Sequence, residues 1–470
     1  MSIILEFSHQ EILFMKKNVD LLNSPIAGVI SKLALPIMGT SLIQMAYNLT
    51  DMIWIGHIGS NAVAAVGAAG MYMWLSSGFA ILARMGGQVL TGQAYGAGNK
   101  DDAAKSSATA IQLGAFSGIV YGLISLFFCG PMMGFFNLSN PQVINDGKWY
   151  IAITCGLVFF NFMNQILTGL LTSIGNSMLT FRSTTIGLLI NLVADPFLIF
   201  GFGPIPALGV KGAALATVFA QVIVFSIYFF HIYDDEILFA KQYIFAKPDF
   251  KKAKDIVSIG FPAAVQSLGF TMISMVISRL IAGWGDAAIA VQRVGTQIES
   301  ISWMTAEGFG SALNAFTAQN YGAGKRERVK KGYHTAMLIM GLWGLFTSFV
   351  LIVFPEPIFR LFIREADVVP MGIAYLRILG LSQLFMCTET AASGVFQGLG
   401  KSTPPSVISI GFNLARIPAA YVLSATVLKL NGIWWSISIS SMFKGIILPI
   451  WLGLYMHKIF KKQTKKHNNL

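Results

Sequence analysis

The sequence QAYGAG at Gln93–Gly98 returns 226 residues later as QNYGAG at Gln319–Gly324. The same spacing pairs Pro36 with Pro262, so the similarity extends over at least two long apolar segments in each copy. Membrane proteins that transport solutes are often built from two similar bundles of helices, because two halves can rock against each other. The repeat therefore predicts two related halves, and its Gly-Ala-Gly turns are expected to end a helix in each half.

The composition is that of an integral membrane protein. Of the 470 residues 54% are hydrophobic and 11% are charged, and the mean hydropathy is +0.65. A soluble domain carries about 25% charged residues. Apolar stretches of about 20 residues recur along the whole chain, which is the length that crosses a bilayer as a helix. Alternating β-type segments do not recur, so we expect an all-α membrane protein embedded in a lipid bilayer.

The net charge of +12 does not indicate nucleic-acid binding, because the basic residues gather in short loops between the apolar segments. Lys and Arg mark the cytoplasmic side of a membrane protein. One set of loops, together with both ends of the chain, carries most of them. We therefore predict a multi-pass protein of the inner or plasma membrane with both termini in the cytoplasm. The opposite loops hold only Lys148, Lys211, Arg360, Arg364 and Lys429.

Twelve spans are expected, six in each half. The chain divides into an N-terminal segment (1–25), a first lobe (26–231), a polar linker (232–255), a second lobe (256–457) and a basic tail (458–470). Proline inside a helix removes a backbone donor and bends the helix, so bends are expected at Pro36 and Pro262. The predicted spans are 26–56, 62–92, 106–130, 148–173, 178–202, 207–231, 256–282, 287–318, 333–354, 368–397, 404–428 and 431–457.

The order of these motifs resembles the multidrug and toxic compound extrusion (MATE) family over residues 25–457. The resemblance is carried by the doubled Gln-x-Tyr-Gly-Ala-Gly, by Asn48–Asp51, by Asn191-x-x-x-Asp195-Pro196 and by Gly212–Thr217. It implies two six-helix lobes around a central cavity. It also implies export of varied, often cationic organic compounds, driven by inward flow of Na⁺ or H⁺, with no organic cofactor.

Acidic residues inside spans are the strongest functional signal, because an acid there costs about 2.5–3.5 kcal/mol on insertion scales. Asp51 lies in the first span and Asp195 in the fifth, with Asn191 four residues before Asp195. Thr217 in the sixth span adds a hydroxyl. Such an oxygen-rich set suits a hard cation, and carboxylates also bind protons. In the MATE family the residues matching these four form a cation site, with Na⁺ as the metal when Na⁺ is the ion.

The second half lacks this pair of acids. Asp51 aligns with Ile277 and Asp195 with Ile417, whereas Asn191 keeps its partner Asn413. The fold therefore tolerates isoleucine at the equivalent places, and we expect ion coupling to reside in the first lobe. A purely structural role, with Asp195 tethering the bend at Pro196 and Asp51 bonding a neighbouring helix, is the alternative.

Further polar and soft side chains on the spans are expected to line the substrate path, since methionine and aromatic surfaces adapt to unlike ligands. Glu307 and Glu389 in the second half could attract a cationic substrate, or could pair with a base such as Arg293 or Lys444. The predicted cavity residues are Gln44, Tyr47, Asn161, Asn164, Gln165, Gln266, Met272, Glu307 and Glu389.

We expect a monomeric antiporter and not an enzyme. The chain has no Walker motif, so ATP is not expected to be its energy source. A lipid-linked glycan flippase of the same superfamily is the main alternative. A channel, which needs a continuous selective pore, is another. A carrier of the major facilitator type would also have twelve spans, but its Asp-Arg-x-Gly loop after span 2 is replaced here by Gly96–Lys100.

Overall fold

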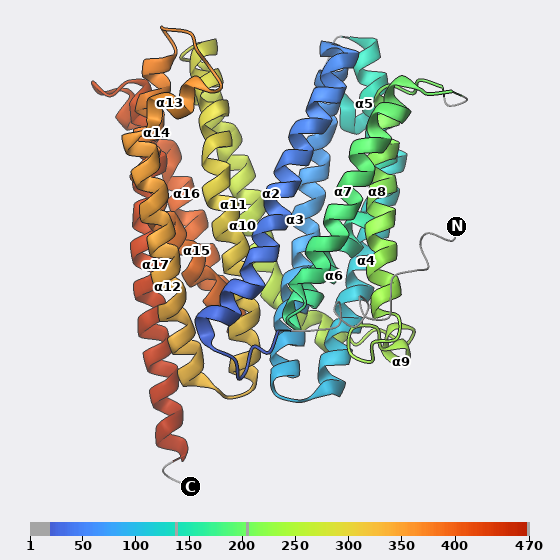
Figure 1. Cartoon of the computed structure of the whole chain (residues 1–470), viewed down its shortest axis with the longest axis vertical. Helices are drawn as coiled ribbons and strands as arrows, with labels where there is room; N and C mark the ends of the chain where they lie inside the picture. The colour runs from blue at the N-terminus through green and yellow to red at the C-terminus, as the bar shows by residue number, and fades with distance from the viewer. Residues whose placement is uncertain (1–18, 137–139, 204–205, 468–470) are drawn as a thin grey trace. The chain divides into compact units, whose positions relative to one another are not determined.

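A computed structural model describes residues 19–136, 140–203 and 206–467, and these form an array of long helices (Figure 1). Helix formation follows from the long apolar runs with few interruptions. The helices are α2 (Ile26–Ile58), α3 (Ser60–Gly96), α4 (Lys100–Gly134), α5 (Pro141–Thr154), α6 (Phe159–Ser173), α7 (Ser177–Phe200), α8 (Val210–Ile232), α9 (Lys241–Ile244), α10 (Phe250–Ala282), α11 (Asp286–Gly322), α12 (Arg326–Val353), α13 (Pro355–Arg360), α14 (Val369–Gly380), α15 (Gln383–Gly398), α16 (Thr403–Ser424) and α17 (Leu430–His467).

The helices account for the twelve predicted spans. Within the described residues, nine helices are long and apolar enough to cross a membrane, and two bent pairs, α5 with α6 and α14 with α15, bring the number to eleven. The twelfth is α11, which has 37 residues and corresponds to α3 in the repeat but is less apolar. The predicted all-α fold with twelve helices is therefore confirmed.

Two predicted spans are each divided by a bend, of 47° between α5 and α6 and of 42° between α14 and α15. In both breaks a hydroxyl group bonds back to a carbonyl of the preceding turn. Thr154 donates to the Tyr150 carbonyl at 2.7 Å, and Ser382 donates to the Leu379 carbonyl at 2.9 Å. Such bonds compete with the helical ladder and bend helices. The bends occupy corresponding places in the two halves of the repeat.

The repeated Gly-Ala-Gly turns end α3 and α11 as the sequence predicts. Gly98 and Gly324 have φ angles of 75° and 70°, which glycine adopts without steric cost. The amide of Asn99 donates to the Ala94 carbonyl at 3.0 Å, and that of Lys325 donates to the Asn320 carbonyl at 2.8 Å. These bonds satisfy carbonyl groups that the helix end leaves free.

The chain forms two compact units. Unit 1 contains the chain up to Leu21 and Leu35–Ala264, and unit 2 contains Leu22–Ala34 and Val265–Leu470. The first helix of each half is therefore shared, since α2 begins in unit 2 and α10 begins in unit 1. Pro36 and Pro262 lie within two residues of these boundaries.

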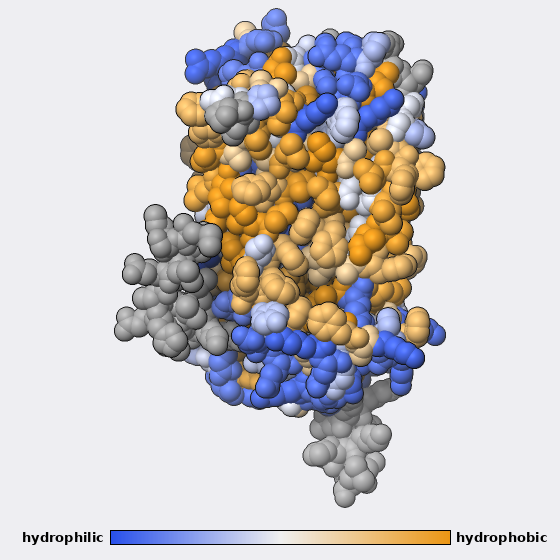
Figure 2. Space-filling model, turned by 90° about the vertical axis from the view of Figure 1, so that its right-hand side faces the viewer, coloured by the Kyte–Doolittle hydropathy of each residue, from blue (hydrophilic) through white to orange (hydrophobic). Residues whose placement is uncertain are grey.

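Unit 1 packs α3 against α4, α5 and α6, and α7 against α8. Asparagine side chains begin three of its helices: Asn99 accepts a bond from Asp102 N, Asn140 from Gln142 N and Asn176 from Leu179 N. Such caps satisfy amide groups that a helix start leaves free. The face of the molecule in Figure 2 carries a band of apolar side chains between two polar ends, as a membrane-embedded surface requires.

The linker contacts unit 1 through its short helix α9. The Gln112 side chain of α4 donates to the carbonyl groups of Tyr243, Ile244 and Ala246 at 2.9–3.1 Å. Lys252 also forms an ion pair with Asp102 at 2.6 Å. The linker and its short helix are thus tied to the first half of α4.

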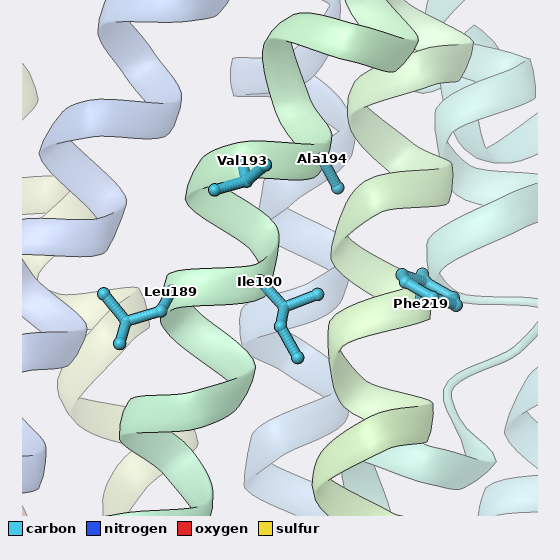
Figure 3. A pocket seen from close by; sticks show the side chains of 5 residues that line it. All are labelled: Leu189, Ile190, Val193, Ala194 and Phe219. Atoms are coloured by element: carbon cyan, nitrogen blue, oxygen red, sulfur yellow. The ribbon is translucent and has the colours of Figure 1, made fainter. Parts of the chain in front are cut away.

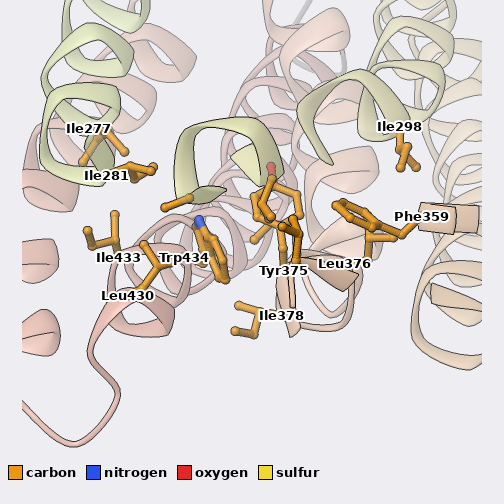
Figure 4. Packing of buried hydrophobic residues seen from close by; sticks show 14 of the residues in the cluster. Ile277, Ile281, Ile298, Phe359, Tyr375, Leu376, Ile378, Leu430, Ile433 and Trp434 are labelled. Carbon is orange, nitrogen blue, oxygen red and sulfur yellow. The ribbon is translucent and has the colours of Figure 1, made fainter. Parts of the chain in front are cut away.

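Unit 2 is built around an apolar core contributed by α10, α11, α12, α13, α14, α16 and α17 (Figure 4). Trp434 and Tyr375 lie at its centre, with ring centroids 5.1 Å apart and ring planes at 85°. Phe359 is fully buried beside them. Edge-to-face aromatic pairs of this kind stabilise a core beyond their buried area.

Candidate ion site

Asp51 on α2 and Asp195 on α7 lie close enough inside unit 1 for their charges to interact. Asp195 is 1% exposed. Asp51 is partly buried, and its Oδ1 atom has neither solvent access nor a hydrogen-bond partner among the described residues. No ion pair of a described base with either acid is present. The cluster therefore holds two acids whose charge is not compensated by the protein.

Asn191 completes the acid pair from the same face of α7, one helical turn before Asp195. Its Nδ2 atom donates to Asp195 Oδ1 at 3.4 Å. Asn191 is 1% exposed, and its Oδ1 atom is buried without a partner in the described structure. An unpartnered buried oxygen is costly, so Asn191 and Asp51 both present oxygen atoms that need a donor or a cation.

Thr217 on α8 and Tyr47 on α2 meet beside the acids, with their hydroxyl oxygens 3.2 Å apart. Thr217 donates its single hydrogen to the Ala213 carbonyl at 3.0 Å, so the Tyr47 hydroxyl is the donor to Thr217. The lone pairs of the Tyr47 oxygen then remain available as acceptors. Tyr47, expected on the substrate path, is thus placed with the acids, whose charges both act on its hydroxyl.

Buried Tyr150 on α5 is a member of the cluster that sequence reasoning missed. The charges of Asp51 and Asp195 act on its hydroxyl. Tyr150 aligns with Tyr375, which is buried in unit 2 next to Glu299. A tyrosine at the same place in both halves of the repeat could have pointed to Tyr150 from the sequence alone. In the same way, an acid within the eighth predicted span could have pointed to Glu299.

Chemically, the cluster offers carboxylate, amide and hydroxyl oxygens from four helices, α2, α5, α7 and α8. Hard monovalent cations and protons are the partners that such groups bind. Among the described residues there is no group of three or more His, Cys, Asp or Glu side chains that could hold a metal ion. The arrangement therefore lacks the ligand set of a transition-metal site.

The other predicted side chains are distributed over both units. In unit 1, Gln165 donates to Asn161 at 2.7 Å, and Asn164 donates to the Gln221 carbonyl at 2.9 Å. Gln44 is half-buried on α2. These groups lie on spans of unit 1 but do not share a hydrogen bond with the acid cluster in the described structure.

In unit 2, Glu389 forms an ion pair with Lys444 at 3.0 Å, which is one of the two arrangements expected from the sequence. Gln266 accepts a hydrogen bond from Ser406 at 3.1 Å. Met272 and Glu307 have exposed side chains within the unit. Their roles toward a substrate stay predictions.

An apolar hollow of about 440 Å³ lies beside α7 and α8 (Figure 3). It is lined by Leu189, Ile190, Val193 and Ala194 of α7 and by Phe219 of α8. Two residues along a helix turn its direction by about 200°, so the exposed Leu189 and Val193 point away from Asn191 and Asp195. The hollow offers no polar group to an ion.

Membrane-length helices in two repeat-related units, with a cluster of uncompensated acids inside one of them, define an integral membrane transporter. The family model described as MatE matches residues 36–197 and 262–422, once in each half of the repeat. The chain belongs to the MatE family, whose members are multidrug efflux transporters and not enzymes.

Named relatives agree with this assignment. A probable multidrug resistance protein NorM of Thermotoga maritima is 26% identical over 436 residues, covering 92% of this chain and 90% of the relative. A FAD transporter of Shewanella oneidensis is 26% identical over 375 residues, covering 78% and 80%. A solved outward-facing structure of a multidrug resistance MATE family transporter superimposes with a TM-score of 0.87 at 22% identity, over 95% of this chain and 99% of that one.

Proposed function

We propose that this protein is a cation-coupled antiporter that exports diverse, often cationic organic compounds across the cytoplasmic membrane by alternating access. The proposal rests on the Asp51–Asp195 cluster of unit 1, which holds acidic charge without a paired base. An integral membrane protein keeps such a costly group only where it serves a purpose. Membership of a multidrug efflux family supports the same conclusion.

The coupling ion would bind between Asp51, Asn191, Asp195 and Thr217. Na⁺ would take carboxylate oxygens, the Asn191 amide oxygen and the Thr217 hydroxyl as ligands, with Tyr47 as an additional oxygen. A proton would bind to one carboxylate and relieve the repulsion between the two acids. Either ion removes the same imbalance of charge, so the site suits both.

Ion flow and drug export are coupled when each ligand favours a different state of the carrier. Cation binding from outside would favour release of the compound, and binding of the compound inside would favour release of the cation. Polar side chains such as Asn161, Gln165 and Gln266 are our assignments for contacts with the exported compound. We place both termini in the cytoplasm and take the monomer as the working unit.

The proposal is tested with purified protein in liposomes loaded with ethidium, a fluorescent organic cation. An inward Na⁺ gradient and an inward proton gradient are imposed separately, and ethidium efflux is followed. We expect at least one gradient to accelerate efflux in the wild type and neither to do so in the Asp51→Asn/Asp195→Asn double variant. Efflux that ignores both gradients in the wild type would contradict antiport.

A further inference from the structure

Unit 2 contains a second acid that the proposed mechanism does not use, the partly buried Glu299 on α11. Its Oε1 atom has no solvent access and no hydrogen-bond partner among the described residues. The Tyr375 hydroxyl of α14 lies next to this carboxyl group and interacts with it. A buried carboxylate with one unsatisfied oxygen is unfavourable, which makes this acid a place where an ion is expected to bind.

A chain of hydrogen bonds leads to Glu299. Trp434 Nε1 donates to Gln292 Oε1 at 3.0 Å, and Gln292 Nε2 donates to Thr296 Oγ1 at 3.2 Å. The hydroxyl oxygens of Thr296 and Tyr375 are 3.4 Å apart. The Thr296 oxygen accepts from Gln292, so its hydrogen is free to be donated to Tyr375, and Tyr375 can in turn donate to Glu299. In this arrangement every donor of the chain points toward the acid.

The chain joins the surface of unit 2 to its interior. Thr296 is exposed, Tyr375 is 1% exposed, and the Glu299 carboxyl oxygen is inaccessible. Gly295 makes the approach possible, because a Cβ atom at this position would collide with the Tyr375 ring. A row of hydroxyl groups between an exposed side chain and a buried carboxyl oxygen can pass a proton.

The charges around Glu299 also favour a proton over a metal cation. Arg416 of α16 acts on Glu299, but its guanidinium donates to Ser440 at 2.6 Å and to Ser441 at 3.1 Å. No ion pair with Glu299 is present in the described part of the chain. A bound metal ion would lie near Arg416, which repels it.

Among the neighbours of Glu299, Arg416 is the group whose charge decides between the ionised and the protonated form of this acid. Tyr375 of α14 and Arg416 of α16 are the titratable groups that act on Glu299; among the described residues α12, which also packs on α11, contributes none. Glu389 of α15 acts on Arg416, and Arg416 acts on Lys444 of α17. Glu389 and Lys444 neutralise each other in their ion pair. An ionised Glu299 gains the attraction of Arg416, whereas a protonated one no longer needs a donor at its buried oxygen.

From this geometry we infer that Glu299 is a proton-binding site of the second lobe, reached through Thr296 and Tyr375. The inference deepens the antiport proposed above and rests on it for its role in transport. Unit 1 would bind the coupling ion at Asp51 and Asp195. Unit 2 would bind and release a proton at Glu299, beside Arg416. A change of pH would therefore act on each lobe at a different acid.

The test is infrared difference spectroscopy of the purified full-length protein, stepped between alkaline and acidic pH. We expect the wild type to show a carbonyl band of a buried protonated carboxyl group that is missing in Glu299→Gln, a loss of about one bound proton per molecule. Asp51→Asn/Asp195→Asn should keep that band, and Glu356→Gln, at an exposed ion pair of α13, should match the wild type. Identical difference spectra for the wild type and Glu299→Gln would overturn the inference.

Tyr375→Phe supplies an independent readout, and decides the matter if Glu299→Gln does not fold. Removing the hydroxyl interrupts the chain, so we expect the Glu299 band to form at least about tenfold more slowly after a pH jump. Unchanged kinetics would contradict the route. The infrared signal needs no transport, so it fails only if this inference fails, whereas efflux that ignores imposed gradients contradicts the antiport alone.

Discussion

Ile277 and Ile417 pack in one apolar cluster of unit 2, at the two positions that Asp51 and Asp195 occupy in unit 1. Ile277 is 4% exposed, so its place is part of the core. The same architecture therefore closes around two isoleucines in one half and around two acids in the other. The acids are not needed to build the fold, which makes their removal an informative experiment.

Asp51→Asn and Asp195→Asn should each abolish gradient-driven export. The amide keeps the shape of the side chain but removes the charge that attracts the cation. We expect at least a tenfold loss in the rate of ethidium efflux with unchanged amounts of protein in the membrane. Glu356→Gln, which neutralises an exposed acid, is the control and should transport normally. Normal export by both aspartate variants would remove the basis of the site.

Asn191→Leu should weaken cation affinity while sparing the fold. The substitution removes the amide that bonds Asp195 and the unpartnered Oδ1 atom. A loss of about 1.5–3 kcal/mol is expected for one such contact to a charged group, which is roughly a tenfold to 150-fold higher cation concentration for half-maximal efflux. Transport at saturating cation should change little.

Asn413→Leu provides the matched control for this variant. Asn413 is the repeat partner of Asn191, is equally buried at 1% exposure and donates to Ser409 at 3.4 Å, but has Ile417 where Asn191 has Asp195. Its replacement should leave the cation dependence unaltered. Equal shifts in the two variants would show that the effect of Asn191 is structural.

Tyr47→Phe and Thr217→Val should act on the same interaction. The two hydroxyl groups share a hydrogen bond, with Tyr47 as the donor. Each single variant should raise the half-maximal cation concentration by about threefold to tenfold, because each removes an oxygen from the cluster. The double variant should cost less than the sum of the two single changes, as contacting residues do in double-mutant cycles. Full additivity would indicate that the two side chains act separately.

Lys444→Met should destabilise unit 2. It leaves Glu389, which is 9% exposed, without its partner, and breaking a buried pair from one side costs about 3–5 kcal/mol. Thermal unfolding of the detergent-solubilised protein should therefore begin at lower temperature. Glu389→Gln in the same chain should recover most of the loss, because the uncompensated charge is gone. A double variant as unstable as Lys444→Met would contradict this explanation.

Gly86→Leu should prevent normal packing of α3 against the start of α10. A Cβ atom at Gly86 would collide with the Ile256 carbonyl, and one at Gly260 would collide with that of Leu82, so the helices touch backbone to backbone within unit 1. We expect a strong loss of folded, monodisperse protein in size-exclusion chromatography. Gly67→Leu on the same helix, where a Cβ atom meets nothing within 4 Å, should give normal yield.

The helical architecture was accessible from the sequence because its determinants are local. Apolar length marks the spans, and the repeated glycines at Gly98 and Gly324 mark helix ends. Asp51 and Asp195 could be singled out because an acid within a span is costly wherever it occurs. Their mutual arrangement with Asn191 followed from helix periodicity and from the family resemblance.

Other features depend on contacts that the sequence pattern does not encode. The bends near Thr154 and Ser382 interrupt otherwise continuous apolar runs, and nothing in the residue pattern marks them. The pairing of Glu389 with Lys444 was one of several that spacing allowed. Tyr47 was expected to face the substrate because nothing along the chain shows that its hydroxyl reaches Thr217 on a distant helix.

The first turns of α2 belong to unit 2, and the first turns of α10 belong to unit 1. This arrangement has a consequence for expressing the two halves of the chain as separate fragments. A cut in the linker, before Phe250, would leave unit 1 without the start of α10 and unit 2 without Leu22–Ala34. Each fragment produced alone would expose a surface that the other normally covers. Co-expression of both fragments in one cell should therefore be required for either to accumulate. A gene duplication of this kind preserves, within a single polypeptide, the mutual dependence of a domain-swapped dimer.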